Sequence, residues 1–348
     1  MMDKNSLRCL YWNIHGISSK ILGNKNEDPE FLKIISDFDI VCLSELHTSK
    51  IISLPGFCLK KQKFRRKKHK GPKIGGGIAV FINQKIVNNF RVVKNDHEDS
   101  IWIKSVGDDK TLFGFYYCSP DYGDSNFFEV VNGEINKLNN EENTLIFGDF
   151  NARTKTECEN VAHDKYDDDL GIHSEITDLP LSRNSEDTKL INKRGREFLD
   201  ICRVNDLTIA NGRTLGDFFG KFTCHQKKGS SVVDYLITPW KNLDNILDFR
   251  VGDINPILSD HCPIIATLHL DKAIRHEKDQ TIKMLNLPDR FIWDTDSTET
   301  FSKKLKSEEY KKKVEGLLEK KDLKVDDIKN LLIDTANTSR IRKTKKNT

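Results

Sequence analysis

The sequence lacks the features that mark membrane, secreted or disulfide-bonded proteins. No run approaches the roughly 18 consecutive apolar residues that span a bilayer, and residues 1–6 lack the apolar stretch of a signal peptide. The eight cysteines form no C-x-x-C pair and lie scattered, mostly inside apolar runs. We therefore expect a soluble, intracellular protein with free, buried thiols, without a zinc site and without disulfides.

Apolar residues are also scarce, at 37% of 348 residues, whereas charged residues make up 31%. This composition indicates a solvated appendage beside a folded core. Residues 272–348 carry 20 Lys or Arg against 14 Asp or Glu, whereas residues 1–271 carry 36 against 39. We predict a folded domain over 1–271 and a lysine-rich extension over 272–348, partly helical or disordered, with amphipathic helices at 301–305, 310–318 and 325–336.

Acidic residues are absent from the stretch 60–73, which holds nine Lys or Arg. A run this dense is expected to face solvent or a polyanion. It is open to three interpretations: a solvated loop, a phosphate-backbone contact that weakens as salt rises, or a nuclear-localisation signal. Its four central cations are the predicted nucleic-acid contacts: Arg65, Arg66, Lys67 and Lys68.

Short apolar runs predict many strands and few helices. Strands are expected at 7–12, 40–43, 78–82, 100–106, 111–118, 145–147, 207–210, 232–238 and 261–270, and helices at 29–38, 124–138 and 195–204. Residues 152–190 are polar and acid-rich and predict a long surface excursion. Because strands and helices do not alternate strictly, an α+β layered sandwich is favoured over a doubly wound sheet. Gly75–Gly77 lacks the G-x-x-x-x-G-K-[ST] pattern of a nucleotide-binding loop.

Polar side chains stand at the ends of these predicted strands. They are Asn13, Glu45, Tyr117, Asp149, Asn151, Asp234, Asp260 and His261. One such residue means little, because acids and amides are common in turns. Strands of one sheet can deliver their terminal side chains to one rim, so the whole set predicts a shared site.

These residue types suit metal-assisted hydrolysis of a phosphodiester. Glu45 offers a hard oxygen ligand for a divalent cation, with Asp260 as a second ligand, directly or through water. Asp149 and Asn151, two residues apart, can accept a proton and orient a water. His261 is held as an imidazolium if Asp234 hydrogen-bonds one ring nitrogen. Taken singly, each residue can also be interpreted as part of a turn or as a core residue whose hydrogen bonds are made within the protein.

In this order, Trp12-Asn13, Glu45, Tyr117-x-x-Pro120, Gly148–Asn151, Val233–Tyr235 and Ser259–His261 resemble the endonuclease/exonuclease/phosphatase superfamily over about residues 7–270. Further stretches resemble the apurinic-like endonuclease domains of non-LTR (LINE-type) retrotransposon polyproteins: Gly148–Thr154, Asn192–Gly195, Leu199–Cys202, Asn211–Arg213 and Ser230–Tyr235.

The resemblance implies a four-layer α/β sandwich, two packed mixed β-sheets flanked by helices, with its site at one rim. It implies Glu45 as the main Mg²⁺ ligand, with Mn²⁺ as a substitute, and Asp149 as the group that activates or orients the attacking water. It assigns positioning to Asn13 and Asn151, phosphate contact to Tyr117, and orientation of His261 to Asp234. His261 would stabilise the pentacovalent charge, and Asp260 would assist at the metal or the leaving oxygen.

The implied activity is nicking of one DNA strand to leave a 3′-hydroxyl that primes reverse transcription, in the nucleus at the time of action. DNA is the expected partner, with no membrane and no small-molecule cofactor beyond the metal. Two alternatives stay open: a phosphatase of inositol lipids or similar substrates, and an inactive nucleic-acid-binding remnant. His15 stands where many repair endonucleases carry a metal-associated Asp, so a preference for abasic sites is not expected.

Overall fold

The computed structural model describes residues 6–19, 21–65, 75–106, 110–120, 127–138, 143–159, 182–269, 291–292, 295–318, 325–338 and 342–343. The chain divides into two compact units, Met1–Ile282 and Lys283–Thr348. The predicted boundary between residues 271 and 272 falls outside the described residues and stays a prediction, as does the surface excursion for residues 160–181.

The first sheet of the N-terminal unit has six strands in the order β15-β16-β1-β4-β6-β5. Their bounds are Ile246–Val251, Ile264–His269, Ser6–Asn13, Ile40–Ser44, Ile78–Asn83 and Phe57–Lys63. The central neighbours β1 and β4 are parallel, and every other pair is antiparallel.

The second sheet repeats this pattern with six strands in the order β11-β14-β10-β9-β8-β7. Their bounds are Leu207–Ile209, Asp234–Pro239, Thr144–Asp149, Leu112–Tyr117, Ser100–Ser105 and Phe90–Val93. Again only the central pair, β9 and β10, is parallel. The two sheets therefore share one pattern of strand directions, although their strands follow the chain in different orders and the sequence shows no internal repeat.

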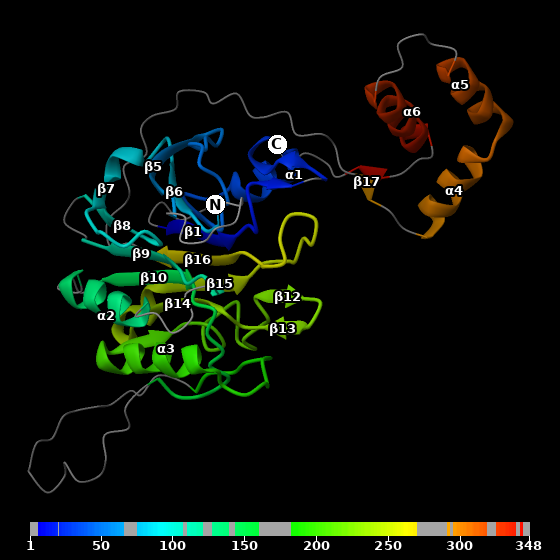
Figure 1. Ribbon diagram of the computed structural model, residues 1–348. Helices are drawn as coiled ribbons and strands as arrows, with labels where there is room; N and C mark the ends of the chain where they lie inside the picture. The colour runs from blue at the N-terminus through cyan, green and yellow to red at the C-terminus, as the bar shows by residue number, and fades with distance from the viewer. Residues whose placement is uncertain are drawn as a thin grey trace, which may run out of the picture. The chain divides into compact units, whose positions relative to one another are not determined.

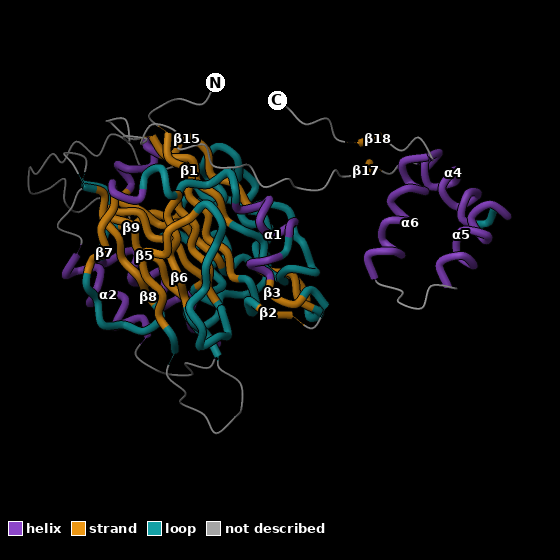
Figure 2. Tube along the Cα trace, turned by 90° about the horizontal axis from the view of Figure 1, so that it is seen from above, coloured by secondary structure: helices purple, strands orange, loops and turns teal. Residues whose placement is uncertain are grey.

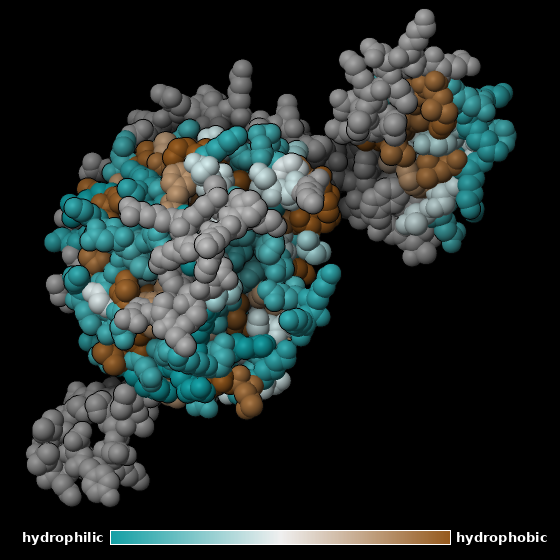
Figure 3. Space-filling view, in the orientation of Figure 1, coloured by the Kyte–Doolittle hydropathy of each residue, from teal (hydrophilic) through white to brown (hydrophobic). Residues whose placement is uncertain are grey.

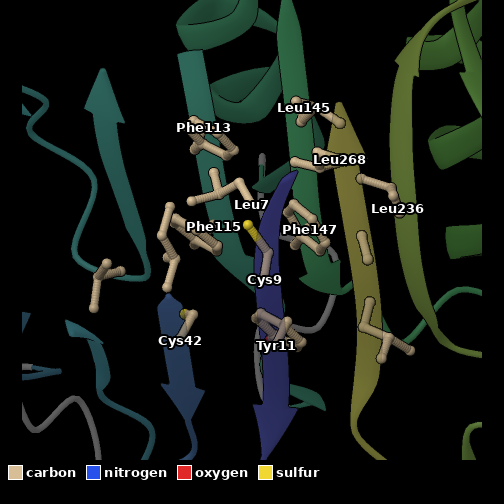
Figure 4. Packing of buried hydrophobic residues seen from close by; sticks show 14 of the residues in the cluster. Leu7, Cys9, Tyr11, Cys42, Phe113, Phe115, Leu145, Phe147, Leu236 and Leu268 are labelled. Carbon is tan, nitrogen blue, oxygen red and sulfur yellow. The ribbon is translucent and has the colours of Figure 1, made fainter. Parts of the chain in front are cut away.

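The alternation of side chains along β1 shows why the sheets stack. Leu7, Cys9 and Tyr11 point into the core between the two sheets, whereas Leu10 and Trp12 join the apolar cluster on the outer face. Figure 4 shows the β1 side chains against phenylalanines of the second sheet. Burying alternate residues on opposite faces is the ordinary consequence of the two-residue period of a strand.

Helices cover the outer face of each sheet, which completes the four layers. Helix α1, Pro29–Ile35, buries Phe31 against the first sheet, and the side chain of Asp28 caps its start by accepting from Phe31 N. Helices α2, Phe127–Leu138, and α3, Lys193–Val204, pack on the second sheet. Figures 1 and 2 show α1 and α2 on opposite sides of the stacked strands. The predicted α+β four-layer sandwich is confirmed.

Several strands were not predicted from the sequence. The hairpin of β12, Cys224–Gln226, and β13, Gly229–Ser231, is short and polar, as is the pair β2, Ser18–Ser19, and β3, Gly23–Asn24. Strands β5, β7 and β15 were not predicted either, because they lie at sheet edges or mix charged residues into their apolar pattern.

The basic stretch is less exposed than expected. Lys63 ends β5, and its Nζ donates to Asn95 Oδ1 at 2.8 Å and to the His97 carbonyl oxygen at 2.7 Å. The side chain of Arg65 is only 10% exposed and lies 3.8 Å from Asp99. The expectation that the whole run faces solvent is therefore wrong for Lys63 and Arg65, since buried cations need acceptors and neighbouring residues supply them. The other three predicted DNA contacts, Arg66, Lys67 and Lys68, lie outside the described residues.

The described residues of the C-terminal unit form three helices, as the sequence predicted: α4, Thr295–Leu305, α5, Glu308–Leu318, and α6, Val325–Thr338. Two short strands, β17, Phe291–Ile292, and β18, Arg342–Lys343, pair antiparallel. Among the residues described, no helix has the length and apolarity needed to cross a bilayer. The face of the N-terminal unit seen in Figure 3 is mostly hydrophilic, with its apolar residues in small separate groups.

Candidate active site

One edge of the stacked sheets collects the predicted residues. Strands β1 and β10 end there with Asn13 and Asp149, and the antiparallel strand β14 begins there with Asp234. In register, Asp149 is the partner of both Tyr117 and Asp234. Asn13 Nδ2 donates to Asp149 Oδ2 at 2.9 Å, which ties the rim of the first sheet to that of the second.

Asp149 is held from both sides. It is fully buried, and its Oδ1 accepts from the backbone N–H of Asn151 at 2.9 Å. The side chain of Asn151 donates to the Cys118 carbonyl oxygen at 2.8 Å and lies 3.4 Å from Asp149 Oδ2. Asn151 is not extended as expected but left-handed, with a φ of 48°. The chain turns directly after Asp149, and this turn provides the second hydrogen bond to the carboxylate.

The environment of Asp149 favours its protonated form. Burial raises its pKa, and the nearby charge of Asp234 raises it further, to about 8, despite the opposing effects of His261 and Asn13. A carboxyl group with this pKa can take up a proton in the neutral range, as a general base must.

His261 and Asp234 form a buried ion pair. His261 Nδ1 lies 2.9 Å from Asp234 Oδ2, so the predicted hydrogen bond is present. Burial lowers the pKa of His261, but the Asp234 charge and this hydrogen bond outweigh it and hold the pKa well above its usual value. The imidazole is therefore held as an imidazolium, with Nδ1 on Asp234 and the Cys224 thiol as a further hydrogen-bond partner of the ring.

Glu45, His15 and Asp260 form a more open group. His15 Nδ1 lies 3.5 Å from Glu45 Oε2 and 3.4 Å from Asp260 Oδ1, and Tyr117 donates its hydroxyl to Glu45 Oε1. Burial raises the pKa of Glu45, but hydrogen bonds from His15 and Tyr117 lower it to about 2. The hydrogen bond with Glu45 also raises the pKa of His15. Glu45 is thus fully ionised at neutral pH.

This open group fits a single divalent cation. Glu45 and Asp260 come from different segments, and His15 Nδ1 lies within 3.5 Å of an oxygen of each. Two carboxylates around one positive group are the hard oxygen donors that Mg²⁺ or Mn²⁺ prefers. Among the described residues, two other groups have ligand atoms within 4.8 Å of one another: Asp149, Asp234 and His261, and Cys224, Asp260 and His261.

Two hydroxyl groups that brace the rim were not predicted. The Tyr11 hydroxyl accepts from Asp149 N at 2.9 Å and lies 2.9 Å from Ser44 Oγ. Ser259 Oγ donates to the Asn13 carbonyl oxygen at 2.7 Å and accepts from His261 N at 3.0 Å. Ser259 lies in the quoted Ser-Asp-His motif, which was a usable signal, whereas Tyr11 looked like any core residue of a strand.

Lys25 is a further unpredicted member. Its buried ammonium donates to the carbonyl oxygens of Ile14 and Leu258. Burial lowers its pKa to about 8, against the raising effect of the Asp260 and Glu45 charges.

Backbone strain is concentrated at the same rim. Four residues other than glycine have left-handed backbones here: His15, Glu45, His47 and Asn151, with φ of 46°, 53°, 49° and 48°. Such conformations cost energy and cluster at functional sites, where the surrounding structure enforces them.

The fold and this rim together define the class of the protein, a hydrolase that acts on phosphodiester bonds. The chain belongs to the Endonuclease/Exonuclease/phosphatase family, whose model matches residues 10–261. The family predicted from the ordered motifs is thereby confirmed. A search of curated proteins finds no match.

Solved structures share the fold at low sequence identity. The endonuclease domain of TRAS1, a telomere-specific non-LTR retrotransposon, is 16% identical with a TM-score of 0.50, covering 77% of this chain and 100% of that domain. The 3′ phosphatase NExo from Neisseria, bound to a product DNA hairpin, is 14% identical with a TM-score of 0.50, covering 75% and 99%. The AP endonuclease LMAP from Leishmania major is 12% identical with a TM-score of 0.51, covering 76% and 88%.

Proposed function

We propose that the protein is a Mg²⁺-dependent DNA endonuclease that nicks one strand and leaves a 3′-hydroxyl. The observation that carries the proposal is the division of charge at the rim. Asp149 has its pKa raised to about 8, while Glu45 has its pKa lowered to about 2, within one hydrogen-bonded site. Phosphodiester hydrolysis needs both a proton acceptor and an ionised ligand for a cation.

Asp149 is the proton acceptor in this reaction. Its carboxylate takes one proton from the attacking water while the water oxygen forms a bond to phosphorus. The bond from phosphorus to the 3′ oxygen breaks, and that oxygen takes up a proton and leaves as the 3′-hydroxyl. Asn13 and Asn151 fix the carboxylate so that its oxygens keep one orientation through the step.

Glu45 and Asp260, the two carboxylates that His15 contacts, would hold the cation, Mg²⁺ or Mn²⁺ as a substitute. When bound, the cation would supply charge neutralisation at the phosphate and a lower pKa for a bound water.

His261 and Tyr117 face the phosphate. The imidazolium of His261, kept protonated by Asp234, donates from Nε2 to a phosphate oxygen as negative charge builds in the transition state. Tyr117 orients Glu45 in the free protein and can turn its hydroxyl to the phosphate.

We further propose that the nick serves target-primed reverse transcription of a retrotransposon, with the protein in the nucleus when it acts. The fold likeness to the endonuclease domain of a telomere-specific non-LTR retrotransposon supports this role, as do the sequence motifs. The basic stretch would bind the DNA backbone through Arg66, Lys67 and Lys68, whereas Arg65 is engaged near Asp99.

Nicking of supercoiled plasmid tests the activity. Wild-type protein is expected to convert plasmid to the nicked form with Mg²⁺ and not with EDTA. Asp149→Ala and His261→Ala should each abolish nicking, whereas His269→Ala, at the other end of β16, should not. If wild-type protein leaves plasmid intact and instead releases phosphate from an inositol phosphate, the endonuclease proposal fails and the phosphatase alternative replaces it.

DNA binding tests the basic stretch separately. Replacing Arg66, Lys67 and Lys68 by alanine should weaken binding and reduce the slope of log affinity against log salt by about 1 for each lost phosphate contact. Arg65→Ala should change that slope less, because this side chain is largely buried. An unchanged slope in the triple variant would remove the stretch from the interface.

A further inference from the structure

We propose that Cys224, Asp260 and His261 form a Zn²⁺ site that overlaps the active site and switches it off when occupied. The Sγ of Cys224, a carboxylate oxygen of Asp260 and a ring nitrogen of His261 all lie within 4.8 Å of one another. Sequence spacing predicts no zinc site, because these ligands come from separate segments and lack a C-x-x-C pattern.

The backbone holds the three residues in place. Cys224 begins β12 and forms an isolated antiparallel bridge with His261. Two backbone hydrogen bonds flank this bridge: Cys262 N donates to the Thr223 carbonyl oxygen at 2.7 Å, and His225 N donates to the Asp260 carbonyl oxygen at 2.7 Å. The ligands therefore sit on a paired segment, which gives a metal site a defined geometry.

His261 already bonds a carboxylate through one ring nitrogen, as zinc-binding histidines do. Its Nδ1 bonds Asp234 Oδ2 at 2.9 Å, so Nε2 is the nitrogen that remains for a metal. Zinc-ligating histidines almost always donate their other N–H to a carboxylate or carbonyl, which fixes the ring and raises its basicity. The Cys224 thiol is hydrogen-bonded to the same imidazole, so sulfur and ring are in contact before any metal arrives.

Asp260 provides the third ligand and the route to solvent. Its side chain is 26% exposed, whereas Cys224 is 3% exposed. Asp260 Oδ1 accepts no hydrogen bond from the described part of the chain, although His15 Nδ1 lies 3.4 Å away. Its Oδ2 accepts only a long contact, 3.3 Å, from Gln226 Nε2. A carboxylate held this loosely can turn toward an ion that enters from solvent.

The donor set selects zinc over magnesium. One sulfur, one imidazole nitrogen and one carboxylate oxygen, with a fourth position for water, is an ordinary zinc coordination set. Mg²⁺ prefers oxygen ligands only, so it has little affinity for the cysteine. On binding, the thiol of Cys224 and Nε2 of the His261 imidazolium each lose a proton to solvent, and sulfur–zinc and nitrogen–zinc bonds form.

Occupation of this site removes two groups that hydrolysis needs. His261 can no longer donate to the phosphate, and Asp260 can no longer serve the Mg²⁺ position. Zinc is therefore a reversible inhibitor, and this inhibition rests on the proposed nuclease function, whereas the binding itself does not.

Cobalt binding tests the site without reference to activity. The full chain, in excess Mg²⁺ and with its thiols reduced, is titrated with Co²⁺, which gives a near-ultraviolet charge-transfer band when a thiolate coordinates it. Wild-type protein should develop the band with one equivalent of Co²⁺ and lose it on addition of Zn²⁺. Removing a residue that only hydrogen-bonds a metal ligand costs about 10–100-fold in metal affinity. Cys224 is itself a proposed ligand, so Cys224→Ser should weaken binding by at least about 100-fold.

Cys158→Ser is the matched control, because Cys158 is an exposed cysteine outside the proposed ligand set. It should retain the band in full, and circular dichroism should show that both variants are folded. The site is refuted if Cys224→Ser keeps the band, if Cys158→Ser loses it, or if wild type shows none. It is equally refuted if X-ray absorption of the zinc-loaded wild type shows no sulfur ligand.

Zinc inhibition of plasmid nicking, at constant Mg²⁺, then tests the consequence. Each nicking rate is expressed relative to the zinc-free rate of the same variant. The Zn²⁺ concentration that halves this relative rate should be at least tenfold higher for Cys224→Ser than for wild type. An unchanged value would refute inhibition through this site. If wild type does not nick plasmid at all, the proposed function fails, while the cobalt titration still decides whether the site exists.

Discussion

The rim divides into two halves, and the pKa of one carboxyl group in each half is shifted in the opposite direction. The buried half, Asp149, Asp234 and His261, is at most 5% exposed at every residue. The open half, His15, Glu45 and Asp260, reaches solvent, with the His15 side chain 64% exposed. The pKa of Asp149 is raised to about 8 in the first, and that of Glu45 is lowered to about 2 in the second.

This difference shows how one sheet edge supports two chemical roles. In the buried half, burial and a second carboxylate favour the protonated form of Asp149. In the open half, burial raises the pKa of Glu45, but hydrogen bonds from His15 and Tyr117 and the charges of His47 and His261 together lower it. Carboxylates whose surroundings separate their pKa values in this way mark the base and the charge-stabilising ligand.

The largest effect is expected from Asp149→Asn in the buried half. The amide keeps the shape but cannot accept the proton, so nicking should fall by about 1,000-fold at any Mg²⁺ concentration. Single-turnover nicking measures the loss, and Asp200→Asn on the exposed face of α3 is the control. Recovery at high Mg²⁺ would show that Asp149 is a metal ligand, and the two halves would then share one role.

Glu45→Gln in the open half should have a smaller effect that depends on the metal. The neutral amide binds the cation weakly, so nicking should fall by about 100-fold at low Mg²⁺ and recover substantially as Mg²⁺ rises. A Mg²⁺ titration of the nicking rate measures this. A loss that Mg²⁺ does not relieve would place Glu45 with the buried half.

Asp234→Asn tests why His261 stays protonated. Without the carboxylate, the effect of burial is opposed only by the weaker effects of Cys224 and Asp149, so the pKa of the imidazole falls and the imidazolium is lost at lower pH. Nicking should drop by about tenfold near neutral pH, and the alkaline limb of the rate profile should move to lower pH. A uniform loss across pH, with the limb in place, would mean that Asp234 acts only by positioning His261.

The smallest expected effect is on stability. The pKa of Asp149 is raised from 3.8 to about 8 in the folded protein, so the folded state binds more protons between these pH values. Stability from this group is fully present below about pH 4 and is lost as pH rises through about 8. In metal-free buffer, the melting temperature of Asp149→Asn should therefore rise relative to that of wild type as pH increases from 5 to about 8. If the melting temperatures of the two proteins instead keep a constant difference across this pH range, burial does not raise the pKa of Asp149.

Much of the site could be predicted because polar residues at strand ends are visible in the sequence. Asn13, Asp149 and Asp234 each follow or precede an apolar run, and the structure brings them to one edge. The partners of Lys63 and Arg65 could not be predicted, because Asn95, His97 and Asp99 lie on a segment about 30 residues away that only pairing of the strands brings near.

The sequence by itself determined which side chains reach the rim, since alternation along each strand and the polar residue at its end are local properties. Only the tertiary structure decided their charge states and the position of Cys224 against His261. These depend on burial and on distances between residues far apart in the chain. The pKa of the Asp149 carboxyl is raised by burial and by the charge of Asp234, and Cys224 lies opposite His261 in an isolated bridge. Both need the folded chain, because strand pairing sets Asp149 opposite Asp234 and an isolated bridge sets Cys224 opposite His261.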